Sequence, residues 1–250
     1  MTGDMAATLY EPINVYKAVA QDIGIVDGPF EYFTVAGIQM PMPFTTRMTV
    51  VSLGSGDLIL HSPIAFDDSL AAELQRLGAV RYLISPNQWH YAHIGEWQRA
   101  YPEAVAWASP GVRERARARH IDVHFDRDLE AAPPEEWCAE LDQTLVPGGI
   151  FQEFVFFHKA SATLILADTI MNLELNKLDE PWRTATKLSG MYYPHGQIFF
   201  GMRVPLLLQR PKAKAASQKI QTWGAQRIIL SHGRCFEGEG AGEVIRRLFT

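Results

Sequence analysis

The sequence predicts an α/β fold in which two β-sheets pack together and helices cover their outer faces. Two hairpins predict the sheets, one formed by β-rich runs at 47–53 and 58–62 and the other by runs at 153–158 and 163–167. Around these hairpins, helical segments alternate with short apolar strands, which is typical of layered α/β proteins. A length of 250 residues suits one such unit, so we expect a single domain over residues 1–250.

The elements expected outside the hairpins follow in chain order. Residues 1–37 hold several glycines and prolines and show little periodicity, so we expect a less regular N-terminal arm there. After the first hairpin, Asp67 or Asp68 can cap a helix that ends at Gly78. The remaining expectations are a strand at 80–84, a helix at 95–100, a strand at 104–108, a helix at 110–120, mostly loop at 121–149, a helix at 169–178, an apolar and aromatic stretch without clear period at 190–210, a helix at 212–223, a strand at 227–230 and a helix at 242–249.

Composition and charge exclude several classes of protein. Apolar residues make up 47% of the chain and charged residues 20%, which is typical of a folded protein rather than a disordered one. The formal net charge of −5 argues against binding to nucleic acid. Charged residues interrupt the most apolar stretch, 154–171, which argues against a membrane span. Cys138 and Cys235 lie in no C-x-x-C spacing, and the first residues show no leader pattern. We therefore expect a cytoplasmic protein that acts on a small-molecule substrate, with neither nucleic acid nor a membrane as partner.

Polar residues that could carry chemistry follow three of the predicted strands. The strand at 80–84 leads into a segment with His90 and His93, the strand at 163–167 ends at Asp168, and the strand at 227–230 is followed by His232. Residues just past the carboxyl ends of strands gather at one edge of a sheet in α/β folds. Three imidazoles and a carboxylate form a donor set suited to zinc, iron or manganese. The sequence therefore predicts a metal site at this edge.

These segments resemble the motifs of the metallo-β-lactamase-fold superfamily, in particular a bacterial branch of unassigned function. Residues 88–95 read Gln-Trp-His-Tyr-Ala-His-Ile-Gly and resemble a degenerate form of the motif H-x-H-x-D-H followed by Ile-Gly. Residues 167–169 resemble the G-D-T motif, and residues 231–233 read Ser-His-Gly, like the closing S-H-G motif. The resemblance spans roughly residues 45–235. It implies a four-layer αββα sandwich with two central mixed sheets.

The departures from these motifs imply a reduced metal site. Gln88 stands where the first motif has a histidine, and Ala92 stands where it has an aspartate. The histidine of a further glycine-rich turn has no counterpart near 147–149, where the nearest potential ligand is Glu153. The resemblance then implies one transition metal ion, zinc first with iron or manganese as alternatives, while a second metal is doubtful. The implied ligands are His90, His93, Asp168 and His232.

Three neighbouring residues have open roles. Gln88 is a poor metal ligand, and we expect it to donate a hydrogen bond to a bound water or anion. Glu153 is either an additional ligand or a solvated residue at the start of a strand. His61 lies where superfamily members commonly carry an acidic residue. It is either a spare ligand that supports the metal site or a hydrogen-bonded histidine at a strand end.

Three functions are compatible with this interpretation. The first is a metal-dependent hydrolase that uses metal-bound water on a small ester, lactone, amide or phosphate-type substrate, with Asp168 as the catalytic base. The alternative is a non-catalytic member of the fold that acts as a binding or association module, and a redox role with iron is a third reading.

Two further segments have open roles. Segment 191–208 is expected either to wall the site or to bury against protein, including association of two copies of the chain. The alternating arginines 113, 115, 117 and 119 favour a solvated helix surface over an anion-binding patch, because residues two apart do not share a helix face.

Overall fold

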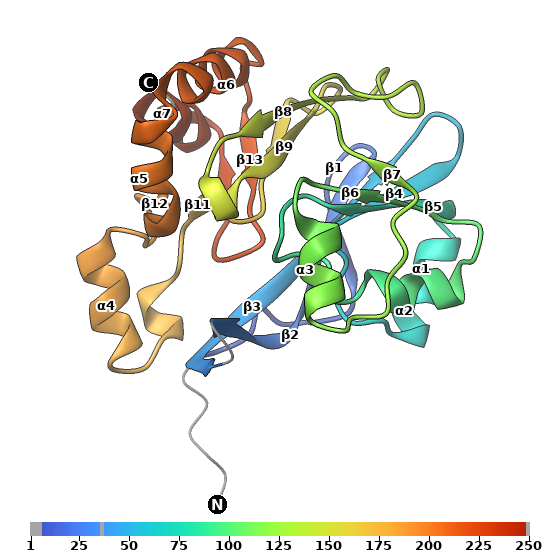
Figure 1. Ribbon diagram of the computed structural model, residues 1–250, viewed down its shortest axis with the longest axis horizontal. Coiled ribbons are helices and arrows are strands. Elements are labelled where there is room, and N and C mark those ends of the chain that lie inside the picture. Colours follow the sequence, from blue (N-terminus) through green and yellow to red (C-terminus); the bar gives the residue numbers. More distant parts are fainter. Residues whose placement is uncertain (1–6, 36–37, 249–250) are drawn as a thin grey trace, which may run out of the picture.

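The computed structural model describes residues 7–35 and 38–248, and within 33–43 it describes only the backbone. The fold consists of two large mixed sheets flanked by helices (Figure 1). The seven-stranded sheet has the order β1-β2-β3-β4-β5-β6-β7, and the five-stranded sheet has the order β14-β13-β10-β9-β8. The strands of the first sheet are β1 (Tyr16–Ala20), β2 (Ile23–Val35), β3 (Ile38–Ser52), β4 (Asp57–His61), β5 (Ala79–Ser85), β6 (Val105–Ala108) and β7 (Arg127–Asp128). Those of the second are β8 (Leu141–Val146), β9 (Glu153–His158), β10 (Thr163–Ile165), β13 (Arg227–Ile229) and β14 (Phe236–Glu237), and β11 (Ile170–Met171) pairs with β12 (Gln197–Ile198).

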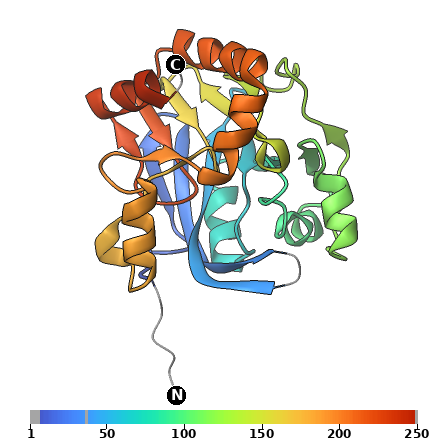
Figure 2. The ribbon, with the colours of Figure 1, turned by 60° about the vertical axis from the view of Figure 1, so that its left-hand side comes forward.

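Helices cover the outer faces of both sheets, on opposite sides of the molecule (Figures 1 and 2). Asp67 caps the first helix, because its carboxylate accepts a hydrogen bond from the Leu70 amide at 2.9 Å. The helices on the side of the first sheet are α1 (Asp68–Gln75), α2 (Ile94–Ala100) and α3 (Val112–Ala118). The others are α4 (Trp182–Ser189), α5 (Phe200–Leu208), α6 (Arg210–Thr222) and α7 (Glu239–Leu248), with 3-10 turns η1 (Gly149–Phe151) and η2 (Leu175–Lys177).

The buried apolar side chains form three layers that match a sandwich. Along β4, Leu58 and Leu60 pack in the cluster shared with α1, α2 and α3, whereas Ile59 faces the cluster between the two sheets. Along β9, Val155 packs in the cluster shared with α6 and α7, whereas Phe156 faces the cluster between the sheets. This alternation follows from the period of two in a strand and gives each sheet two buried faces. The αββα architecture implied by the sequence is therefore confirmed.

Several local expectations were wrong. Residues 16–35 of the expected irregular arm form β1 and β2, because pairing with β3 supplies hydrogen bonds that local composition does not reveal. Gly28 and Pro29 lie at a register shift of β2, which accommodates both residues inside a strand. The expected helix at 169–178 is β11 and η2, whereas the stretch 121–149 is mostly loop, as expected, with β7 and β8 as short strands. Segment 191–208 contains β12 and α5.

Helix α5 leaves a row of large apolar side chains in solvent. Phe200, Val204, Leu207 and Leu208 are each more than half exposed and recur at helical spacing. The association of two copies through this segment stays a prediction. Among the described residues, no helix combines the length and apolar character that crossing a membrane requires.

Candidate metal centre

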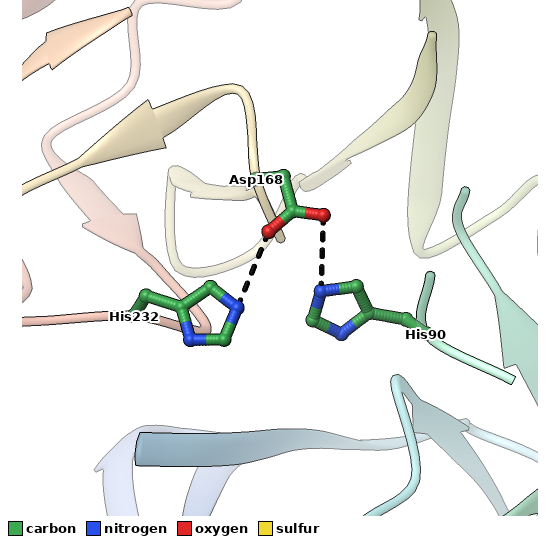
Figure 3. A group of neighbouring side chains, drawn as sticks. All are labelled: His90, Asp168 and His232. Carbon is green, nitrogen blue, oxygen red and sulfur yellow. Dashed lines mark ion pairs between the residues drawn. The ribbon is translucent and has the colours of Figure 1, made fainter. Parts of the chain in front are cut away.

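Three side chains from three strand ends converge on one point (Figure 3). His90 lies in the turn after β5, Asp168 follows β10, and His232 follows β13, which pairs in parallel with β10. His90 Nε2 lies 3.2 Å from Asp168 Oδ2, and His232 Nε2 lies 3.2 Å from Asp168 Oδ1. The potential ligand atoms all lie within 4.8 Å of one another. Both sheets therefore contribute to one His-Asp-His group, as the rule about strand ends predicts.

The outer nitrogen of each histidine has its own partner. His232 Nδ1 lies 2.7 Å from the carbonyl oxygen of Thr45, and His90 Nδ1 lies 2.5 Å from Ser62 Oγ. A carbonyl oxygen only accepts, so Nδ1 of His232 carries a proton. In a neutral His232, Nε2 then presents a lone pair to a carboxylate oxygen, which is unfavourable unless a cation or a proton lies between them. Metal-binding histidines are held in this way, by a hydrogen bond from the nitrogen that does not bind the ion.

The electrostatics of the group also favour a cation. Burial alone raises the pKa of Asp168, but the two histidines outweigh it and hold that pKa well below its usual range. Burial alone lowers the pKa of His90, but the charge of Asp168 and its hydrogen bond outweigh it and raise that pKa. The ionised carboxylate that a metal requires is therefore the favoured form of Asp168. The three donors fit a divalent transition metal ion.

Asn87 positions two members of the group, and sequence reasoning missed it. Its Nδ2 atom donates to Asp168 Oδ2 at 2.9 Å and to Glu153 Oε2 at 3.2 Å. Its Oδ1 atom accepts from the backbone amides of Trp89 at 2.8 Å and of His90 at 3.2 Å. An amide side chain that donates and accepts is required for this double role. The available signal was a polar residue that lies two positions after the strand ending at Ser85.

Glu153 supports the loop that carries Asp168. Its carboxylate accepts hydrogen bonds from the backbone amides of Ala167 at 2.8 Å, Asp168 at 2.6 Å and Thr169 at 3.1 Å. The residue is fully buried, so the expectation of a solvated position was wrong, and it is not part of the His-Asp-His group. Burial, together with the charge of Asp168, raises the pKa of Glu153 to about 7 against the pull of the backbone amides.

The structure does not bring His93 into the group of candidate ligands. Its Nε2 atom lies 2.9 Å from Glu31 Oε1, and its Nδ1 atom lies 3.2 Å from both carboxylate oxygens of Glu96. Burial lowers the pKa of His93, but the hydrogen bonds to the two glutamates outweigh it and raise that pKa. Both ring nitrogens therefore serve as donors to carboxylates. Glu31 comes from β2, in the part of the chain expected to be irregular, so this pairing could not be read locally.

Gln88 and His61 also differ from what the sequence predicted for them. The Gln88 amide packs against Gly111 and lines a separate surface hollow beside α3. His61 is buried, with its ring edge-on to Phe156 at 5.3 Å between centroids. Neither ring nitrogen of His61 has a hydrogen-bond partner among the described residues, so it is not the hydrogen-bonded strand-end histidine that one alternative expected. Nor does it belong to the His-Asp-His group.

The group opens into a cavity of about 250 Å³. Its walls combine the candidate ligands with His93, two arginines of the α3 region and an aromatic cluster. Trp89 stacks on Phe151 with ring centroids 5.3 Å apart, and Phe199 meets Phe151 edge-on at 5.0 Å. A small apolar body therefore fits against the aromatic wall while a reactive group reaches the candidate ligands.

Comparison with solved structures shows which known fold the chain has. The solved structures that the chain resembles include the mono-zinc form of the metallo-β-lactamase FIM-1 from Pseudomonas aeruginosa, with a TM-score of 0.61 and 15% identity over 94% of each chain. The metallo-β-lactamase DIM-1 gives a TM-score of 0.59 and 13% identity over 94% of this chain and 96% of that one. The flavodiiron core of Flv1 from Synechocystis sp. PCC6803 gives a TM-score of 0.58 and 15% identity over 93% of this chain and 59% of that one. The chain has the metallo-β-lactamase fold.

Sequence comparison adds the family. No curated protein sequence matches the chain. A family model described as a domain of unknown function, DUF4336, matches residues 34–181, a span that includes His90 and Asp168 and ends before His232. On this match, the chain belongs to the DUF4336 family.

Proposed function

We propose that the chain is a metal-dependent hydrolase that binds one divalent transition metal ion through His90, Asp168 and His232. The observation that carries the proposal is the convergence of their ligand atoms within 4.8 Å, with the outer nitrogen of each histidine already bonded. Three protein ligands leave a position open, which is typical of catalytic rather than structural zinc sites. FIM-1, whose mono-zinc form shares this fold, offers a precedent for a single zinc ion.

The chain's own residues position the reactants and hold the protons. A bound ion would lower the pKa of a water molecule and polarise a carbonyl or phosphoryl oxygen. Asp168, with its low pKa and both oxygens facing histidines, is a weak base, so we assign it to the ligand set and not to proton transfer. His93 lines the same cavity and carries protons on both ring nitrogens. We assign it the donation of a proton from Nε2 to the leaving group, after which Glu96, which accepts a hydrogen bond from Nδ1, orients the neutral ring.

The substrate is a small ester, lactone, amide or phosphate-type molecule. A volume of about 250 Å³ lies just below the usual range of about 300 to 1,000 Å³ for ligand pockets, which favours small ligands. The aromatic wall of Trp89, Phe151 and Phe199 supplies apolar contact for the body of such a molecule.

A second candidate is a redox function with iron. Two histidines and one carboxylate with open positions form the donor set of many non-haem iron enzymes. The fold is shared with the Flv1 flavodiiron core, which was soaked with metal. Metal identity separates the two candidates.

Elemental analysis of the protein purified without added metal tests the proposal. We expect close to one zinc per chain in the wild type and a loss of metal in His90→Ala and His232→Ala. His124→Ala removes an exposed histidine outside the group and serves as the matched control. Absence of stoichiometric metal from the wild type would overturn the proposal, and iron in place of zinc would favour the redox candidate. Bound zinc with no turnover of ester, lactone, amide or phosphodiester substrates would favour the non-catalytic alternative.

A further inference from the structure

Arg115 differs from the other arginines of α3. Its guanidinium carbon lies 3.4 Å from the centroid of the Trp89 ring, which places the planar group flat on the indole. The residue is half-buried, and its Nε atom is buried without a hydrogen-bond partner among the described residues. Arg113, by contrast, pairs with Asp128 at 2.8 Å.

Arg115 has no acidic partner in the part of the chain that the structure describes. No carboxylate lies within 4.0 Å of its guanidinium nitrogens, whereas the acidic residues that line the cavity are already engaged. Glu31 contacts His93, and Asp168 contacts His90 and His232. Burial lowers the pKa of Arg115, but an arginine stays charged throughout the range in which proteins are folded. Tyr91 hydrogen-bonds the guanidinium but supplies no counter-charge at neutral pH, and a half-buried cation without a counter-ion favours a role in binding an anion.

The position of Arg115 links it to the candidate metal centre. Arg115 and Arg119 are four residues apart, so they share one face of the α3 region, and both line the cavity that also holds His90, Asp168 and His232. The indole under Arg115 belongs to Trp89, the residue before His90, and its ring stacks on Phe151. The Arg115 guanidinium, the rings of Trp89 and Phe151, and the candidate ligands therefore line the same cavity. The expectation that this arginine series is only a solvated surface was wrong for Arg115.

We propose that Arg115, held on Trp89, is the anion-binding group of the cavity and that the substrate is a small molecule with a carboxylate or phosphate at one end and an apolar body. A guanidinium fixed on an aromatic face keeps in-plane N–H donors for the two oxygens of such a group. The apolar body lies along Trp89 and Phe151, and the bond to be cleaved lies toward His90, Asp168 and His232. This assignment of a substrate class rests on the proposed hydrolase function, whereas the binding of an anion at Arg115 does not.

A pair of isosteric probes tests anion binding. The probes are 3-phenylpropanoate and its neutral analogue 3-phenylpropanamide, titrated calorimetrically into full-length protein freed of metal with a chelator, so that no ion can bind the carboxylate. We expect the wild type to bind the anion about tenfold or more tightly than the amide, in line with a charge-assisted hydrogen bond. Equal affinity for the two probes would overturn the proposal.

Variants of α3 locate the anion. Arg115→Gln is expected to abolish the preference for 3-phenylpropanoate, and Arg115→Lys, which keeps the charge but loses the planar stack, is expected to retain only part of it. Arg117→Gln removes an exposed charge from the same helix outside the cavity and is expected to bind like the wild type. If Arg115→Gln kept the full preference, the anion would lie on other groups, such as protonated histidines, and the proposal would fail.

The metal content of the variants separates this proposal from the hydrolase function. Arg115→Gln is expected to retain the metal of the wild type, because the residue does not belong to the His-Asp-His group. If Arg115→Gln does not fold, the affinities of Arg115→Lys and of the wild type for the two probes still test whether Arg115 binds the anion. If the wild type carried no metal as purified but still bound the anion more tightly through Arg115, the hydrolase function would be refuted and the anion site would stand.

Discussion

The Asn87 side chain donates a hydrogen bond to Asp168 Oδ2 at 2.9 Å. The same side chain accepts hydrogen bonds from the backbone amides of Trp89 and His90. One buried amide therefore fixes the turn that carries one candidate ligand and the carboxylate of another. Residues that hold metal ligands in place commonly change metal affinity by about 10- to 100-fold when they are removed.

Removal of Asn87 is expected to weaken metal binding. Asn87→Ala leaves Asp168 and the turn at His90 without their shared partner, so we expect the zinc affinity to fall by about 10- to 100-fold. Competition with a chromophoric chelator measures the affinity. Asn176→Ala, at an exposed position, is the control. The melting temperatures of the two metal-free proteins show whether Asn87→Ala is folded like the wild type. If they agree and the zinc affinity is unchanged, the positioning role is contradicted.

Substitution of His93 is expected to separate catalysis from metal binding. His93→Gln keeps a polar side chain but removes the proton shared with Glu31, while the His-Asp-His group is untouched. We expect the metal content to stay that of the wild type and kcat to fall by about 10²- to 10⁴-fold, the usual contribution of a general acid. Metal analysis and steady-state kinetics on the same preparation check both halves. Loss of metal in His93→Gln would show that this residue is a ligand after all.

His61 is expected to make the folded protein sensitive to acid. Burial, reinforced by the charge of His90, lowers the pKa of His61 to about 3, against about 6.5 in an unfolded chain. Below pH 6.5 the unfolded chain gains a proton that the folded chain does not, so stability falls with pH by up to about 1.4 kcal/mol per unit toward pH 3. Above pH 6.5 this histidine adds no pH dependence.

His61→Leu removes this penalty. Urea unfolding at pH 7 and pH 5 is expected to show a smaller loss of stability in His61→Leu than in the wild type, by up to about 2 kcal/mol. At pH 7 the variant is expected to be as stable as the wild type or more so, because two buried nitrogens without described partners disappear. The exposed His124, replaced by leucine, is the control. An identical loss in His61→Leu and the wild type would refute this account.

Helix α5 is expected to mediate association of two copies. Phe200, Val204, Leu207 and Leu208 expose a continuous apolar face, and patches of this kind commonly mark contacts between proteins. We expect the wild type to sediment as a dimer and Leu207→Asp to sediment as a monomer in sedimentation velocity. Leu188→Asp changes an equally exposed leucine outside α5 and is expected to have no effect. A wild type that is monomeric at every concentration would end this prediction.

The fold and the core of the site were accessible from the sequence. His90, Asp168 and His232 each follow a run of apolar residues long enough to be recognised as a strand, and the edge rule for α/β sheets then brings them together. The two predicted hairpins likewise indicate two sheets, and the side chains of β4 and β9, which pack on both faces of their sheets, agree with this. These inferences depend on local patterns and on one general rule of topology.

The remaining features depend on contacts between distant segments. His93 matches a ligand motif, but Glu31, a residue 62 positions away, engages its Nε2 atom. Glu153 looks like a surface carboxylate until the amides of residues 167–169 are folded around it. Arg115 is one of four similar arginines, and only the position of Trp89 distinguishes it. No periodicity in the chain encodes such pairings.

The candidate ligands come from both halves of the sandwich. His90 follows β5 of the seven-stranded sheet, whereas Asp168 and His232 follow β10 and β13 of the five-stranded sheet. An ion held by all three would join the two sheets as a cross-link in addition to any part in a reaction. At a concentration one hundred times its dissociation constant, such an ion adds about 2.7 kcal/mol to the free energy of unfolding. Chelation would then lower the melting temperature of the whole protein and not only its activity.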